Sequence, residues 1–224
     1  MTLSHPRRED EDLVVAFFRA CDLALDVARS DPISARWESD SVLEGFTIGA
    51  LVAHLYSAIR LFESALDKPE ASYDRVGDIT SFYILNRVDD RVQLQDDFHV
   101  AIRRYAAQLA EQGPDVLIAK FDALATRPRG ALADVAMTRL VPIWRIEGGA
   151  TQLGDYLRTR VVELVVHADD LAASVDIEIE IPAEAAGVAF AAFLDLARSR
   201  SGDVAVMRAF ARGERCDPEV LRVL

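Results

Sequence analysis

One stretch decides the fold: Tyr156-Leu-Arg-Thr-Arg-Val-Val-Glu-Leu-Val-Val-His-Ala-Asp-Asp-Leu171. Wound as an α-helix, it is apolar around most of its circumference, which is typical of a helix buried in a protein core. A line of polar side chains interrupts this surface at helical spacing: Tyr156, Arg160, Glu163, His167, Asp170 and Ser174. Because helix residues three and four apart lie one above the other, Glu163 and His167 project side by side. A buried carboxylate is costly without a positive partner, so this pair is a candidate two-ligand grip on a metal ion.

Three further segments repeat apolar residues with a helical period, and with the stretch above they predict a helix bundle. The expected helices cover about 10–29, 47–66, 90–112 and 151–174. Thr47 is the expected N-cap of the second helix. Gly113-Pro114 ends the third helix, and a shorter helix is expected at 115–125. Cys21 lies on the apolar stripe of the first helix, which favours a core position over a nucleophilic role.

The connections between these helices are expected to hold little regular structure. Residues 31–45 are predicted to be a loop, and the polar residues 67–90 a long connection with a short ordered piece around 79–85. One or two short extended pieces are expected between 131 and 146, where Pro142 limits any regular strand.

The chain after the bundle is expected to form a small appendage. Alternating Ile and acidic residues at 176–182 predict a short half-buried strand, and helices are expected at 183–200 and 204–212. The expected fold is therefore mainly α, a four-helix bundle with a few short strands and a helical C-terminal appendage. Its predicted parts are a flexible tail 1–9, a metal-binding bundle 10–175 and an extension 176–224 packed on the bundle.

Composition and charge exclude several classes of function. The net charge of −12 argues against nucleic-acid binding, which needs clustered Lys and Arg. No apolar run approaches the roughly 18 residues of a membrane span, and the N-terminus lacks a secretory segment. A cytoplasmic protein without a membrane partner is expected. The absence of a phosphate-binding Gly-rich loop, a Gly-x-Ser-x-Gly elbow and a dinucleotide fingerprint excludes nucleotide-binding and serine-hydrolase functions.

A third metal ligand is expected from the second helix, where His54 lies beside the apolar stripe and near small residues that allow close helix approach. Bundles often build metal sites from side chains that project inward from facing helices. His54, Glu163 and His167 would offer two nitrogens and one oxygen, and three protein ligands with one open position are typical of catalytic zinc. The alternative is that His54 is a packed, hydrogen-bonded core histidine.

Other members of the polar line have two interpretations each. Arg160 is predicted to hold the second oxygen of Glu163 or to bind an anionic substrate, and the alternative is a simple ion pair within the helix. Asp170 is predicted to accept the free ring N–H of His167, the usual way of fixing a ligand tautomer, unless it only faces solvent. Tyr156 is predicted to line the cavity or to pack in the core.

Two segments resemble one known family. Leu43-Glu-Gly-Phe-Thr-Ile-Gly-Ala-Leu-Val-Ala-His54-Leu resembles the Gly-[Trp/Phe]-Thr-x-x-x-Leu-x-x-His-Leu segment of mycothiol-dependent maleylpyruvate isomerase N-terminal domains. Asp155-Tyr-Leu-x-x-Arg-x-x-Glu-x-x-x-His-x-x-Asp-Leu171 resembles the second signature of that family. The resemblance covers roughly residues 10–175 and implies a DinB-like four-helix metalloprotein fold, with His54, Glu163 and His167 as the zinc ligands.

The resemblance also implies a cofactor and a reaction class. The expected cofactors are a divalent metal, zinc or alternatively nickel, and the low-molecular-weight thiol mycothiol. Metal coordination deprotonates a thiol, and the thiolate would attack an electrophilic small molecule, as in a thiol S-transferase or an isomerase. The alternatives are a non-catalytic metal-binding or regulatory module and a hydrolase that uses metal-bound water.

Two departures from the family are visible in the sequence. The isomerases carry a larger α/β C-terminal domain, whereas the fifty or so residues after Val175 are few and helical. Gly49 stands where relatives commonly have a longer polar residue. The expected oligomeric state is a monomer or a homodimer, because the Ala-rich terminal helix suits an interface as well as it suits covering the bundle.

Overall fold

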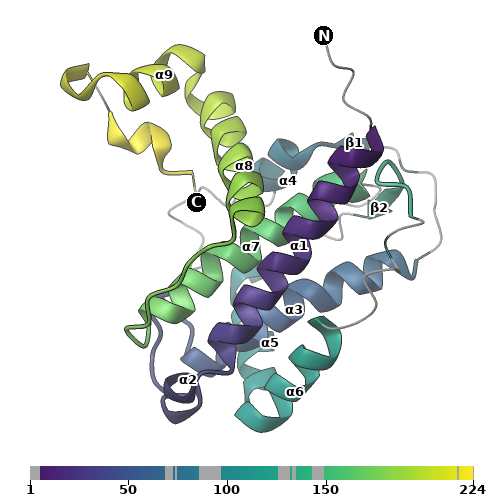
Figure 1. Cartoon of the computed structure of the whole chain (residues 1–224), viewed down its shortest axis with the longest axis vertical. Helices are drawn as coiled ribbons and strands as arrows, with labels where there is room; N and C mark the ends of the chain where they lie inside the picture. Colours follow the sequence, from purple (N-terminus) through teal and green to yellow (C-terminus); the bar gives the residue numbers. More distant parts are fainter. Residues whose placement is uncertain are drawn as a thin grey trace.

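A computed structural model of the chain describes residues 6–68, 73, 75–85, 97–125, 132, 135–142, 149–215 and 217–223. The predicted mainly α fold is confirmed, with a small three-stranded sheet beside the helices (Figure 1). The bundle consists of α1 (Pro6–Ala28), α3 (Ile48–Leu66), α5 (Asp97–Ala110) and α7 (Leu153–Ala173). These four helices correspond to the four that the hydrophobic period predicts, with ends that differ by a few residues.

Helix α7 is the centre of the bundle. It packs against α1 on one side and α3 on the other, and α3 in turn packs against α5. Leu157, Leu164 and Leu171 recur every seven residues along α7 and are fully buried. Each buried leucine contributes on the order of 1.5–3 kcal/mol relative to an exposed one. Helix α6 (Pro114–Ala125), also expected, packs across α1 and α3.

Thr47 begins α3 as predicted, because its side chain accepts a 3.1 Å hydrogen bond from Ala50 N. Gly49 follows in a tight contact: a Cβ atom there would lie 2.5 Å from the Trp37 indole. Trp37 is buried and donates a hydrogen bond of 3.0 Å from Nε1 to Ala110 O at the end of α5. A longer side chain at position 49 would displace the tryptophan, which is the physical reason for glycine in this chain.

The segment 31–45 is not a loop throughout, because it begins with α2 (Asp31–Ala35). Pro32 stands in the first turn, where its missing N–H costs nothing. The sequence signal that ends α1 therefore also starts a second helix. Ile33 of α2 is fully buried and anchors this short helix to the core.

The sheet lies next to the start of α7. Its order is β1 (Arg75–Gly77), β3 (Gly149–Gln152), β2 (Leu140–Pro142), with β1 parallel and β2 antiparallel to β3. Strand β2 lies in the region where extended pieces are expected, whereas β1 and β3 are not predicted. Helix α4 (Ile79–Leu85) follows β1 and corresponds to the short ordered piece expected in the long connection.

The predicted strand at 176–182 is wrong. Asp176 is in a turn with a φ of 60°, and residues 177–182 belong to no helix or strand. Ile177, Ile179 and Ile181 are nevertheless half-buried and pack against the core, while Glu178 and Glu180 are exposed. The alternation therefore reports one-sided burial of an irregular segment rather than membership of a sheet.

The C-terminal arm, residues 183–223, contains α8 (Ala183–Ser201), α9 (Asp203–Ala211) and the 3₁₀ helices η3 (Gly213–Arg215) and η4 (Pro218–Leu221). Helix α8 packs on α1 and α7. Helix α9 and η4 pack on α8 and on each other, so α9 lies beyond the body of the bundle (Figure 1).

Four smaller expectations concern the N-terminal tail, the start of the third helix, Cys21 and membrane-spanning segments. Helix α1 begins at Pro6, inside the expected tail 1–9, whose first five residues lie outside the described residues. Residues 90–96 of the expected third helix also lie outside them. Cys21 is fully buried on α1, as predicted, with a free thiol. Among the described residues, no helix has both the length and the apolar character needed to cross a bilayer.

Candidate metal centre

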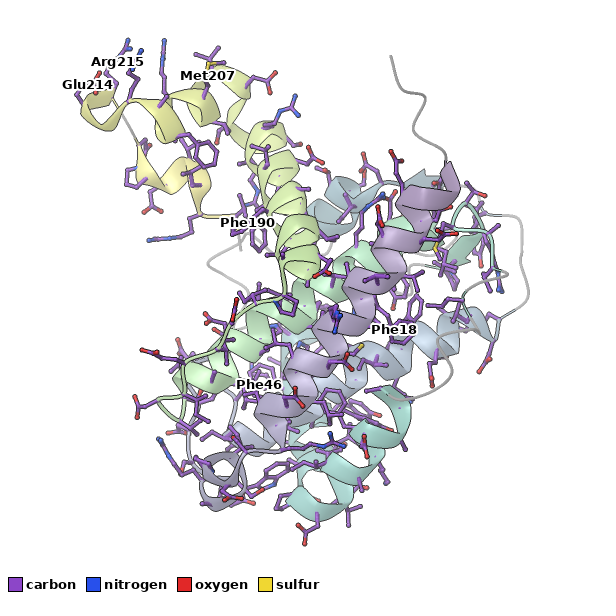
Figure 2. The ribbon with its side chains drawn as sticks, viewed as in Figure 1. Phe18, Phe46, Phe190, Met207, Glu214 and Arg215 are labelled. Carbon is purple, nitrogen blue, oxygen red and sulfur yellow. The ribbon has the colours of Figure 1, made fainter. Side chains whose placement is uncertain are left out.

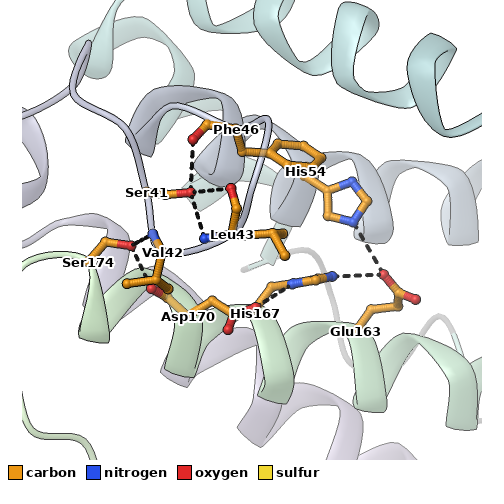
Figure 3. A network of polar contacts seen from close by, with 9 residues as sticks. All are labelled: Ser41, Val42, Leu43, Phe46, His54, Glu163, His167, Asp170 and Ser174. Carbon is orange, nitrogen blue, oxygen red and sulfur yellow. Dashed lines mark hydrogen bonds and ion pairs between the residues drawn. The ribbon is translucent and has the colours of Figure 1, made fainter. Parts of the chain in front are cut away.

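The structure brings His54, Glu163 and His167 together between α3 and α7 (Figure 3). His54 Nε2 lies 3.3 Å and His167 Nε2 lies 3.5 Å from the same oxygen, Glu163 Oε2. One potential ligand atom from each residue lies within 4.8 Å of the other two. Within the described part of the chain, no other group of three His, Cys, Asp or Glu side chains comes close enough to share an ion.

The distances fit a tetrahedral metal ion. Zinc bonds to nitrogen and oxygen are about 2.0–2.2 Å long, so two ligand atoms of a tetrahedron lie roughly 3.3–3.6 Å apart. The two contacts to Glu163 Oε2, at 3.3 and 3.5 Å, are in this range. Two imidazole nitrogens and one carboxylate oxygen are a donor set that zinc accepts in catalytic sites. The three residues therefore fit a divalent metal, and as its ligands they stay a prediction.

The cluster is partly exposed to solvent. The side chains of His54, Glu163 and His167 are 18%, 21% and 18% exposed, whereas most positions next to them, such as Leu55, Leu164 and Ala168, are fully buried. The small residues Ala50, Ala53 and Ala58 lie on the buried surface of α3, as the close-approach argument requires.

Asp170 fixes the second nitrogen of His167. The distance from His167 Nδ1 to Asp170 Oδ2 is 2.9 Å, so this ring nitrogen donates to the carboxylate and Nε2 is directed toward Glu163. This arrangement corresponds to the expected acceptor role of Asp170. A carboxylate in this position selects the tautomer that can bind a metal and raises the basicity of the ligand.

The loop 41–46 forms a wall beside the two histidines and is tied to the end of α7 (Figure 3). Ser174 Oγ donates to Asp170 O at 2.7 Å and accepts from Val42 N at 3.0 Å. The aromatic ring of Phe46 lies 5.5 Å from the His54 ring, centre to centre. The last polar residue of the α7 line, Ser174, therefore fastens the loop that covers the site rather than contacting the ligands.

Charge in the cluster is set by mutual hydrogen bonds. Burial alone raises the pKa of Glu163, but hydrogen bonds from His167 and His54 and the charge of Arg160 hold that pKa well below its usual value. Burial lowers the pKa of His54 despite its bond to Glu163. At His167, bonds to Asp170 and Glu163 outweigh burial and raise the pKa from 6.5 to about 9. At neutral pH the cluster holds an ionised carboxylate, a neutral imidazole and a protonated imidazole.

Arg160 and Tyr156 lie one and two turns before Glu163. Arg160 is buried, and its guanidinium lies 4.9 Å from the centre of the Tyr156 ring while Nε donates to Thr159 Oγ1. It therefore acts on Glu163 through its charge rather than through the expected close ion pair, which is not formed among the described residues. Tyr156 stacks against Phe62 in the core. Substrate binding by Arg160 and a cavity-lining role of Tyr156 stay predictions.

The sequence argument missed Tyr83, a fully buried residue of α4. Burial and the negative charge of Glu163 both raise its pKa well above the ordinary value, so the phenol lies within electrostatic reach of the cluster. The signal in the sequence was weak. Ile79 and Tyr83, four residues apart and both buried, are the inward-facing pair of a helix only two turns long.

A family model matches most of the chain. Residues 18–172 match the model described as the mycothiol maleylpyruvate isomerase N-terminal domain, and the match includes all three cluster residues. No curated protein and no solved structure shows significant similarity to the chain.

Proposed function

The chain belongs to the mycothiol maleylpyruvate isomerase N-terminal domain family, and we propose that it is a metal-dependent enzyme in which mycothiol attacks an electrophilic small molecule. The observation that supports this function is the convergence of His54, Glu163 and His167 within 4.8 Å, with each side chain partly exposed to solvent. A structural metal site would instead be closed by four protein ligands.

The metal supplies one piece of chemistry, the lowering of a thiol pKa so that a thiolate is available at neutral pH. Zinc suits two imidazoles and a carboxylate, and nickel is the alternative. The residues of the chain do the rest. Asp170 holds the His167 ring in one tautomer, and the Phe46 ring of the loop 41–46 lies next to the His54 ring.

Attack by the thiol sulfur forms a carbon–sulfur bond, and the thiol proton is released to solvent. If the electrophile carries a leaving group, its departure leaves a thiol conjugate. If the electrophile is an activated double bond, rotation followed by loss of the thiol returns an isomer. The positive charge of Arg160, close enough to lower the pKa of Glu163, favours a substrate with an acidic group. The substrate class is therefore an electrophile, and a carboxylated one would gain from Arg160.

The experiment is an activity screen of the metal-loaded protein with mycothiol and a panel of electrophiles, followed by mass and absorbance changes. We expect turnover that requires both metal and thiol, and that is lost in Glu163→Ala. Asp169→Ala is the matched control, since Asp169 is an exposed carboxylate on the same helix. Turnover with metal but without thiol would overturn the thiol function in favour of a hydrolase. Metal binding without turnover of any electrophile would favour a non-catalytic module.

A further inference from the structure

The C-terminal arm exposes apolar side chains that its own chain leaves uncovered. Of the ten large hydrophobic residues that are exposed among the described residues, five lie on α8 and α9: Phe190, Leu194, Val204, Met207 and Phe210. Figure 2 shows Met207 on the outer side of α9, away from the bundle. Where exposed apolar side chains form one contiguous surface, that surface is typical of interaction sites in soluble proteins.

Helix α9 has one buried face and one exposed apolar face. Val206 is 3% exposed and packs within the arm, whereas Val204, Met207 and Phe210, spaced three apart, are 58%, 65% and 69% exposed. Arg208 and Arg212, one turn apart, are exposed beside this stripe, and residues 204–212 contain no acidic side chain. Asp203 at the start of α9 pairs with Arg198 of α8, and Arg212 is the C-cap of α9. With two arginines against one carboxylate, α9 and its C-cap form a weakly cationic amphipathic segment, here called the docking helix.

A groove lined by acidic side chains lies between α1, α4, α7 and α8, away from the metal centre. It has a volume of about 1210 Å³, above the roughly 300–1,000 Å³ of small-molecule pockets. Leu13, Val15 and Val188 are among its apolar lining residues, here called the apolar floor. Six carboxylates also line it, here called the carboxylate rim: Glu9, Asp12, Asp78, Asp155, Glu184 and Asp195.

The two arginines that line the groove neutralise only part of this rim. Arg158 pairs with Asp155 at 2.7 Å, and Arg198 pairs with Asp203 at 2.6 Å and with Asp195 at 3.6 Å. Six carboxylates against two arginines still leave the groove acidic. The charge of the whole chain is divided in the same sense. Residues 183–224 are neutral overall, because they hold six acidic and six basic side chains. The whole net charge of −12 therefore belongs to residues 1–182, which supply the α1, α4 and α7 walls of the groove.

We propose that the docking helix of one chain binds in the acidic groove of a second copy. The second copy binds the first in the same way, so that the protein forms a homodimer with two identical contacts. The apolar stripe of α9 matches the apolar floor, and Arg208 and Arg212 match the carboxylate rim. None of the described α9 residues lines the groove of its own chain. A reciprocal contact places the same two surfaces on both subunits and closes with twofold symmetry.

Charge complementarity favours a second copy over the other possible occupants. A cationic amphipathic helix can also lie on an anionic membrane, but this helix belongs to a protein whose net charge is −12 and which such a surface repels. The acidic groove and the cationic helix occur on one polypeptide at equal concentration. The proposal is independent of the metal centre, whose residues contribute to neither surface.

The test is a charge swap followed by sedimentation velocity over a wide concentration series. Wild type should sediment with twice the mass of the chain. The arm variant R208E/R212E and the groove variant D12K/E184K should each sediment as a monomer, because each then faces like charges in a homodimer. Mixed one to one, they should restore the dimer, since both contacts of the mixed dimer are again between opposite charges. Arg104→Glu, at an exposed position of α5, is the control and should stay dimeric.

Three results would overturn the proposal. These are a wild type that is monomeric throughout the series, a dimer that survives either double variant, and a mixture that fails to dimerise although both variants show wild-type thermal unfolding. Binding of monomeric wild type to vesicles rich in anionic lipid, lost in R208E/R212E, would assign the docking helix to a membrane surface instead.

Discussion

The metal centre and the C-terminal arm both depart from the usual distribution of residues, in which charged side chains are exposed and apolar side chains are buried. The metal centre buries ionisable groups, and the arm exposes apolar ones. At the centre of α7, ionisable groups are buried, and they are held by one another: Glu163 by two histidines, and His167 by Asp170. On α9, Val204, Met207 and Phe210 remain 58%, 65% and 69% exposed. Folding alone favours neither arrangement, because a buried charge and an exposed apolar stripe each cost free energy. The two regions therefore point to two different partners, a cation and a second protein surface.

The largest expected difference between the regions is in stability. Leu157→Ala removes a fully buried side chain of α7 and should lower the free energy of unfolding by about 2–5 kcal/mol. Met207→Ala, on the exposed stripe, should change it by less than about 0.5 kcal/mol in the monomer. Urea unfolding of both variants at low concentration measures the contrast. Equal losses would mean that the arm stripe is covered within its own chain.

A change of pH should act on the metal centre and leave the arm unaffected. In the metal-free protein His167 has a pKa of about 9, above its ordinary 6.5, so its charge stabilises the fold fully below pH 6.5 and this contribution is lost as the pH rises through 9. A metal ion must displace that proton, so between these values metal affinity should rise about tenfold per pH unit. Titration calorimetry in buffers of different ionisation enthalpy should show release of about one proton. A pH-independent affinity would contradict the assignment of His167 as a ligand.

Asp170→Asn should weaken the metal centre without emptying it. The amide still reaches His167 Nδ1, now 2.9 Å from the carboxylate, but it no longer stabilises the ligand tautomer by charge. Loss of such a partner typically lowers metal affinity by about 10–100-fold. Competition with a chromophoric chelator measures this change, with Asp169→Asn as the control. An unchanged metal affinity would show that the hydrogen bond from His167 to Asp170 does not contribute to metal binding.

The smallest effect is expected where the loop meets α7. Ser174→Ala removes the acceptor of the Val42 N–H, at a cost of about 1 kcal/mol in stability. The loop 41–46 should then exchange its amide hydrogens faster, while the oligomeric state stays that of wild type. Hydrogen exchange followed by mass spectrometry measures the loop 41–46 and the C-terminal arm in the same experiment. Unaltered exchange of the loop would mean that the Ser41 hydrogen bonds alone hold it.

The sequence was informative where local periodicity decides the structure. On α7, Glu163 and His167 had to share a face once the helix was recognised, and the small residues of α3 indicated which side of His54 would meet it. The sheet could not be predicted in this way. Strands β1 and β3 are three and four residues long, contain glycine, and pair residues more than seventy positions apart. Their stability comes from long-range pairing, which leaves no local pattern.

The errors have similar causes. The isoleucines at 177, 179 and 181 alternate as a strand would, but none of the described strands pairs with them. Tyr83 was missed because one short helix in a polar connection carries little hydrophobic signal, although the charge of Glu163 contributes to the raised pKa of Tyr83. Arg160 was placed correctly on the polar line, and its contacts in the structure include the Tyr156 ring and Thr159 Oγ1.

The central claim is that His54, Glu163 and His167 bind one divalent metal ion, and metal content after loading tests it directly. Purified protein is incubated with zinc or nickel, freed of excess metal and measured by mass spectrometry of the elements. Wild type and the Asp169→Ala control should retain about one equivalent, and His167→Ala should retain almost none. A wild type that takes up no metal, or a His167→Ala variant that keeps a full equivalent, would contradict the account.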